Sequence, residues 1–254
     1  MSSLQVTWGI ASRSLRLIPR LPSTFVPSLV MPVFLTIAFA GAFSGLVFLP
    51  GFPAEKIIDW FIPMTTLQGA AFAGVTTGMG AARDLESGFF DRFMASPASR
   101  YAILAGPLVA SMLRALIPVA LLLLVAVLAG AHFHGGVLGM VVLVMAALGI
   151  GLFAGSWAVG LALRFKTMQA APLMQSGILL AFFLSTAQMP IGLLTGWLHA
   201  VARFNPMTNV LALGRQGFLG TVAWGDTWPG LVSLAGLIAV TLVFAVRSMQ
   251  RVIP

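Results

Sequence analysis

The chain has 254 residues, of which 59% are hydrophobic and 8% are charged, against roughly 25% charged residues in soluble domains. A globule of this size cannot hide so much apolar surface, so the composition excludes an ordinary soluble domain and predicts a membrane protein. The net charge is +8, but the basic residues stand singly between apolar runs, which argues against nucleic-acid binding, and the lack of cysteine excludes disulfides, thiolate catalysis and Cys-ligated metals.

The first 20 residues are predicted to form an amphipathic helix lying on the inner leaflet. They do not resemble a cleavable signal, because arginines continue to Arg20 and the following apolar run is long enough to span. Helical spacing puts Arg13, Arg16 and Arg20 on one face. The opposite face carries apolar side chains, namely Trp8, Ala11, Leu15 and Ile18, while Ile10 and Leu17 interrupt the polar face.

Six apolar segments are predicted to cross the membrane, because a transmembrane helix needs about 20 largely apolar residues. They cover residues 27–49, 60–82, 112–131, 137–163, 169–189 and 227–246. An even number of crossings places both termini on one side. The expected fold class is therefore an all-α membrane protein, with residues 1–254 forming one transmembrane domain.

The basic residues predict the orientation, since cytoplasmic loops carry an excess of Lys and Arg. One side would carry Arg13, Arg16, Arg20, Arg83, Arg92, Arg100, Arg164, Lys166, Arg247 and Arg251. The opposite side has only Lys56, Arg203 and Arg215. Both termini are therefore predicted to be cytoplasmic, and the high usage of alanine, glycine and arginine favours the inner membrane of a bacterium.

Arg114 lies inside an apolar stretch. We expect the lipid-embedded part of the third span to begin near it, so that its guanidinium reaches the cytoplasmic headgroups and residues 101–113 form an interfacial lead-in. The alternative is a functional charge inside the membrane.

A charged, amphipathic stretch, residues 83–100, separates the second and third spans. Its acidic residues keep it in water, its aromatic residues form a bulky apolar surface, and a proline ends the helix. Such a helix is suited to dock into a groove on another protein, although the phenylalanines could instead dip into the lipid interface. The residues involved are Asp84, Glu86, Gly88, Phe89, Phe90, Asp91, Phe93, Met94, Ser96 and Pro97.

The loop between the fifth and sixth spans, residues 190–225, contains the semi-apolar run GLLTGWLHAVARF, which is too short to cross a bilayer. Asn205 and Pro206 break it, and a second short helical piece runs through Arg215. This pattern predicts a re-entrant hairpin on the outer side, or else an ordinary interfacial loop.

Several kinds of chemistry are unsupported. The chain has no P-loop, no Gly-x-Ser-x-Gly elbow and no His-Glu-x-x-His helix, so it is not expected to be an enzyme or to bind a cofactor. The predicted spans contain no Asp or Glu that could relay protons. His132 and His134 lack a neighbouring carboxylate or cysteine in the sequence, so we predict a solvated turn and no metal site.

The run RDLESGFFDRFMASP, followed by Ser99 and Arg100, resembles the cytoplasmic motif of the ABC-2 type permease family. Ser87 before the glycine, and Phe89 and Phe90 after it, depart from the commoner Thr and Leu. The N-terminal helix, the six spans and the outer hairpin with Asn205, Pro206 and Arg215 also fit the family. The resemblance implies that residues 83–97 couple to an ATPase and that the hairpin caps the exit of the pathway.

Polar residues inside two spans are candidates for a substrate path. Thr65, Gln68, Phe72 and Thr76 share one face of the second span, and Gln175, Leu179, Phe182 and Thr186 share one face of the fifth. The same side chains could simply join helices to one another. The resemblance adds weight to the path, because the second and fifth helices of the family face it.

The resulting hypothesis is the permease subunit of an ATP-binding-cassette exporter of the daunorubicin-resistance-like group, moving a hydrophobic or amphiphilic drug, lipid or glycoconjugate. By the resemblance, its partners are two ATPase subunits that bind ATP and Mg²⁺, a second permease copy or homologue, and membrane lipids. Two alternatives are a non-ABC six-helix secondary transporter or channel and a membrane scaffold that transports nothing.

Overall fold

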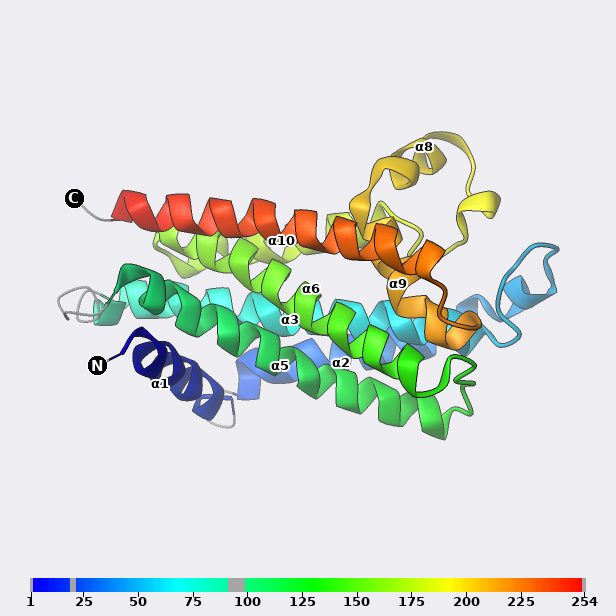
Figure 1. Ribbon diagram of the computed structural model, residues 1–254, viewed down its shortest axis with the longest axis horizontal. Helices are drawn as coiled ribbons and strands as arrows, with labels where there is room; N and C mark the ends of the chain where they lie inside the picture. Colours follow the sequence, from blue (N-terminus) through cyan, green and yellow to red (C-terminus); the bar gives the residue numbers. More distant parts are fainter. Residues whose placement is uncertain (1, 19–21, 91–98, 253–254) are drawn as a thin grey trace.

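The computed structural model describes residues 2–18, 22–90 and 99–252, and within these ranges the chain forms helices and no strands (Figure 1). The α-helices are α1 (Ser3–Arg16), α2 (Pro22–Ala42), α3 (Ile57–Glu86), α5 (Arg100–Leu128), α6 (Gly136–Phe165), α7 (Ala171–Phe183), α8 (Gly196–Phe204), α9 (Pro206–Leu219) and α10 (Trp224–Val252). Short 3-10 helices cover Ser44–Phe48, Met168–Ala170 and Ile191–Leu193. Arg20 and the predicted coupling residues Asp91, Arg92, Phe93, Met94, Ser96 and Pro97 lie outside the described residues.

Three described helices are long and apolar enough to cross a membrane, namely Arg100–Leu128, Gly136–Phe165 and Trp224–Arg251. Ser28–Ala42 and Met168–Phe183 are shorter apolar helices. Although α3 has 30 residues, its polar residues, Thr65 and Gln68 among them, lower its mean hydropathy. The all-helical membrane class is therefore supported, while the count of six crossings stays a prediction.

Two predicted boundaries are wrong. The helix expected over 27–49 ends at Ala42, and the one expected over 169–189 ends at Phe183. Residues 101–113 belong to the third helix, because α5 runs unbroken from Arg100 despite Pro107 and Pro118, and their place at the membrane interface stays a prediction. Neighbouring helices in a membrane protein satisfy the backbone groups that a proline frees, so these prolines need not end the helix.

Helix α3 lies in the middle of the bundle, packed against α2, α5, α6 and α9 (Figure 1). Its closest approach is to α6, where small residues let the backbones meet. A Cβ on Gly74 would lie 2.6 Å from the Gly151 oxygen, and one on Gly78 would lie 2.5 Å from the Ala158 carbonyl carbon. Small residues at such contacts are the usual means of joining helices in lipid.

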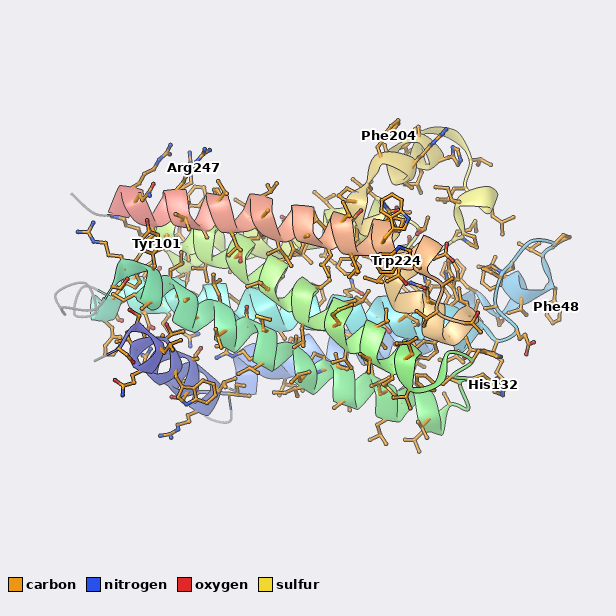
Figure 2. All side chains as sticks on the ribbon, viewed as in Figure 1. Phe48, Tyr101, His132, Phe204, Trp224 and Arg247 are labelled. Carbon is orange, nitrogen blue, oxygen red and sulfur yellow. The ribbon has the colours of Figure 1, made fainter. Side chains whose placement is uncertain are left out.

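The two ends of the bundle differ. α1 and the C-terminal end of α10 lie at one end, and α8, α9 and the 42–57 connection lie at the other (Figure 1). Figure 2 shows Tyr101 and Arg247 at the first end and Phe48, His132 and Trp224 toward the second. Phe48, Tyr101 and Trp224 are exposed, as expected of aromatic residues at the two membrane interfaces.

The predicted N-terminal helix forms over Ser3–Arg16, started by a capping box between Ser2 and Gln5. Trp8 on its predicted lipid face is 59% exposed, while Ala11 on that face is fully buried. Ile10, which interrupts the polar face, packs so closely on α5 that a Cβ on Gly106 would lie 2.6 Å from the Ile10 Cβ. The missing side chain of Gly106 makes room for Ile10, which helical periodicity within α1 alone cannot show.

Candidate functional site

A groove lies between α2, α3 and α7, on the face of α3 away from α6, and encloses a cavity of about 420 Å³. Most of its lining is apolar, with Ser28, Thr76 and Gln175 as the polar groups. The complete lining is Ser28, Met31, Leu35, Phe72, Val75, Thr76, Met79, Gln175, Leu179 and Phe183. Drug-sized ligands occupy pockets of roughly 300–1,000 Å³ with mostly apolar walls and a few polar groups, so this groove has a suitable size and character.

Four of the eight residues on the two predicted path-lining faces, Phe72, Thr76, Gln175 and Leu179, line this groove. Thr65 does not, since its hydroxyl lies 2.7 Å from the Thr36 hydroxyl and joins α3 to α2. Phe182 is fully buried in the core. Neither predicted face lines the groove along its whole length, and its role in transport stays a prediction.

Gln68 is fully buried, and both polar atoms of its amide lack a partner among the described residues. Thr186 is 6% exposed and lines a different cavity, at the end of the bundle that holds α9. Its backbone oxygen accepts a hydrogen bond of 2.7 Å from Arg215. These two predicted path residues therefore lie apart from the groove.

At the opposite end, Asp84 connects the end of α3 to α1. Arg13 donates to both Asp84 carboxylate oxygens, at 2.8 and 3.1 Å, and its guanidinium lies 4.3 Å from the centre of the Phe89 ring. The hydrogen bonds to Asp84 raise the pKa of Arg13 above its usual value. Arg13, predicted to face solvent, instead holds α1 against the predicted coupling segment.

Glu86 connects the same segment to the beginning of α7. One of its oxygens accepts hydrogen bonds from the Met168 backbone N–H at 2.7 Å and the Thr167 hydroxyl at 2.8 Å. These bonds, the Met168 amide first, lower the pKa of Glu86 below its ordinary value. No pattern in the sequence pairs Glu86 with Thr167, because Glu86 ends α3 and Thr167 lies in the connection between α6 and α7.

The chain turns at Gly88, whose φ of +67° lies in the left-handed region that glycine adopts most easily. The predicted aromatic surface needs a correction at Phe90, which is only 9% exposed and packs with Ile103, Leu108 and Met249. Phe89 is partly exposed beside Arg13. Of the described aromatic residues here, Phe89 alone is available at the surface.

Arg114 does not extend to the headgroups as expected. It is 7% exposed and donates to the Thr76 hydroxyl at 3.1 Å, to the Ser14 hydroxyl at 3.0 Å and to the Ser14 backbone oxygen. The surface-anchor interpretation fails because α1 lies over this part of α5 and provides bonding partners before the side chain reaches water.

In the predicted outer hairpin, Asn205 joins two helices. Its side-chain oxygen accepts from the Met207 amide and starts α9, and Pro206 occupies the first helical position. Its side-chain nitrogen donates to the backbone oxygens of Ala181 and Leu184, at 2.8 and 2.9 Å, at the end of α7.

Arg215 anchors the hairpin to the beginning of α3. It is 2% exposed, donates to the backbone oxygens of Trp60, Thr186 and Ala187, and lies 3.6 Å from the centre of a Trp60 ring. The sequence gives one hint of this arrangement, since an arginine in an apolar hairpin needs partners that replace water.

The histidines lie at the same end. A ring nitrogen of His134 is 2.8 Å from the Phe218 backbone oxygen, and the His132 amide donates to Asp59 at 3.0 Å. In the described part of the chain, no group of three or more His, Asp or Glu side chains could hold a metal ion.

Long apolar helices with aromatic residues at both ends define a helical membrane protein, and it contains a ligand-sized, mostly apolar groove. The chain belongs to the ABC-2 type transporter family, whose profile matches residues 5–219. It is 26% identical over 231 residues to the daunorubicin resistance ABC transporter permease protein DrrB1 of Streptomyces coeruleorubidus, covering 90% of this chain and 80% of that protein.

Proposed function

We propose that this chain is the permease subunit of an ABC exporter and that the groove between α2, α3 and α7 is part of its path for a hydrophobic or amphiphilic substrate. Family membership supports the transporter class. The observation that carries the path is the groove itself, in which Ser28, Thr76 and Gln175 are the polar groups among apolar walls that include Phe72. The name of the relative makes daunorubicin a reasonable first probe.

In this proposal two copies, or one copy and a homologue, work with two separate ATPase subunits in a bacterial inner membrane, with both termini in the cytoplasm. The ATPase would contact the segment around Phe89. The bonds from Asp84 to α1 and from Glu86 to the beginning of α7 support a mechanical role for this segment. A push on it would reach α7, which forms one wall of the groove.

The groove is tested with inverted membrane vesicles that contain the permease and its ATPase, by measuring ATP-dependent daunorubicin uptake. Phe72→Ala on α3 and Gln175→Leu on α7 change the lining. Leu180→Ala is the control, because Leu180 is an exposed residue of α7 that does not line the groove. We expect the first two to change the KM for uptake and the third to leave it unchanged. Equal kinetics for all three variants would contradict the assignment of the groove.

The partnership is tested by affinity purification in mild detergent. Recovery of a P-loop ATPase in near-equal amount would support it, and a chain that repeatedly purifies alone would count against it. A double variant, Phe89→Ser with Phe93→Ser, should weaken recovery, whereas Phe90 is kept because its substitution would disturb the core.

A further inference from the structure

A small pocket lies between α1, α3 and α5, at the end of the bundle where α1 lies. Cationic side chains from all three helices line it, namely Arg13, Arg83 and Arg114. Asp84 is the only acidic residue among the lining residues that the structure describes. Three positive charges thus meet one negative charge.

The carboxylate of Asp84 is engaged with Arg13, in the only ion pair found among the described residues. Arg114 is more than nine-tenths buried, and its hydrogen-bond partners among the described residues, Thr76 and Ser14, are uncharged. A buried cation without an anion is costly, so the site favours a negative ligand.

Two buried polar atoms in the lining also lack a partner among the described residues. They are the Nε of Arg114 and the hydroxyl of Thr77, a residue only 3% exposed. Buried polar groups in folded proteins are nearly always hydrogen-bonded, so two unsatisfied atoms in one pocket indicate a missing polar group. Both are hydrogen-bond donors, which suits a phosphate group because its oxygens accept hydrogen bonds.

Its volume distinguishes this pocket from the groove between α2, α3 and α7. Its cavity is about 100 Å³, against about 420 Å³ for the groove. A drug-sized molecule needs roughly 300 Å³ or more, so the pocket suits a small polar group and not a whole cargo molecule.

The position of α1 indicates where such a group would come from. Leu4 and Trp8 on α1 are 80% and 59% exposed, and Tyr101 at the beginning of α5 is also exposed. Exposed apolar and aromatic side chains beside arginines are typical of an element at the membrane interface, where lipid phosphates lie.

We propose that this pocket binds a phosphate group and that its source is the headgroup of an anionic phospholipid of the inner leaflet. The choice of leaflet rests on the proposed topology. A bound phosphate joins α1 to α3 and α5. It also lies beside Thr76, which lines both this pocket and the transport groove, so lipid occupancy is linked to the shape of the groove.

The test measures thermal unfolding and lipid retention of the purified full-length chain in detergent, with added phosphatidylglycerol or phosphatidylcholine. The wild type should retain phosphatidylglycerol roughly tenfold more strongly, as expected for charge-assisted hydrogen bonds, and should unfold at a higher temperature with it. Equal retention of the two lipids by the wild type would overturn the proposal, without reference to any variant.

Arg114→Gln removes the charge, and Arg247→Gln removes an equal charge at the same end but outside the pocket. The first should lose the preference for phosphatidylglycerol and the second should keep it. An equal loss in both would mean that only general surface charge matters, which overturns the site. If Arg114→Gln does not fold, Thr77→Val takes its place, because it removes the unpartnered hydroxyl from the pocket. It should weaken the preference for phosphatidylglycerol relative to Arg247→Gln.

Inorganic phosphate separates the two possible sources. Stabilisation by phosphatidylglycerol that phosphate alone does not reproduce supports the lipid. Equal, Arg114-dependent stabilisation by phosphate alone would keep the phosphate site and overturn its assignment to lipid. These measurements need neither the ATPase nor transport, so their failure is distinguishable from failure of the proposed function.

Discussion

Arg215 is a buried cation whose partners in the structure are backbone oxygens and an aromatic ring. Three carbonyl groups from two segments, at Trp60 and at Thr186-Ala187, accept its N–H groups. We expect Arg215→Met to lower the free energy of unfolding by about 3 kcal/mol, because it leaves these oxygens without a donor.

Thermal unfolding in detergent checks this expectation, and Arg215→Lys is the matched control. Lysine keeps the charge, but its ammonium group cannot reproduce the fork of the guanidinium, so it should restore part of the loss. Wild-type stability in Arg215→Met would show that the three bonds do not hold the hairpin.

The stability of the protein should depend on pH through Glu86. Its hydrogen bonds to Met168 and Thr167 place its folded-state pKa below the ordinary value of 4.5. The carboxylate therefore stabilises the fold above that value, and the stabilisation is lost as the pH falls through the folded-state pKa. The difference in unfolding temperature between wild type and Glu86→Gln should be present at about pH 7 and should shrink progressively as the pH falls below 4.5. A difference that persists in acid would assign the effect to packing.

At the scale of elements, the contact between α3 and α6 depends on glycine. Gly78 faces α6, where an added Cβ would meet the Cβ and backbone of Ala158, whereas Gly80 has nothing within 4 Å of its position. Gly78→Ala should cost about 1–3 kcal/mol through overpacking. Gly80→Ala on the same helix should stabilise by up to about 1 kcal/mol, because alanine favours the helical backbone.

Thermal unfolding of Gly78→Ala and Gly80→Ala, measured side by side in one detergent, tests whether their effects on stability are opposite. Equal stabilities would mean that α3 and α6 are less closely packed than the structure shows. The two variants differ only in which face of α3 receives the methyl group, so helix propensity cancels between them.

The types of the elements could be predicted from the sequence, because a long apolar run in a membrane protein forms a helix and so does an amphipathic run that bears arginines on one face. Their limits were not. α7 ends at Phe183 in the structure, where the side-chain nitrogen of Asn205 donates to the Ala181 and Leu184 oxygens, and that donor lies far along the chain. α5 continues through Pro107 because its neighbours, and not its own sequence, decide whether a proline breaks it.

For the candidate site, helical periodicity put Phe72 and Thr76 on one face of α3 and Gln175 and Leu179 on one face of α7, and these four line the groove. It also put Thr65 and Phe182 on the same two faces, although neither lines the groove. Periodicity gives the angle of a residue around its helix and not the neighbour at each height. Toward one end α3 meets α2 through Thr65, and farther along the groove separates them. The pairings of Asp84 with Arg13 and of Glu86 with Thr167 join distant segments, which periodicity within a helix cannot show.

At the scale of the whole molecule, the orientation in the membrane is open to direct measurement because the natural chain has no cysteine. Glu55→Cys and Thr195→Cys place single thiols at the end with α8, and Ser2→Cys and Ser87→Cys place them at the opposite end. A membrane-impermeant maleimide should label the first pair in spheroplasts and the second pair only after lysis. The reverse pattern would invert the proposed topology, and labelling of all four would rule out an intact crossing between them.

The amide of Asn205 also has a consequence for the order of synthesis. A chain is made from its N-terminus, so the Ala181 and Leu184 oxygens leave the ribosome 24 and 21 residues before their donor. An unsatisfied carbonyl costs several kcal/mol in hydrocarbon, and a helix of 13 residues reaches only about 20 Å across a core about 30 Å thick.

We therefore expect α7 to wait at the translocon and to enter lipid together with α8 and α9. In ribosome-bound chains carrying Leu180→Cys, the thiol should stay reactive until Asn205 has emerged, and earlier protection would show that α7 inserts alone. A stop codon shortly before Asn205 would then leave a chain with an unfinished helix as well as a missing end.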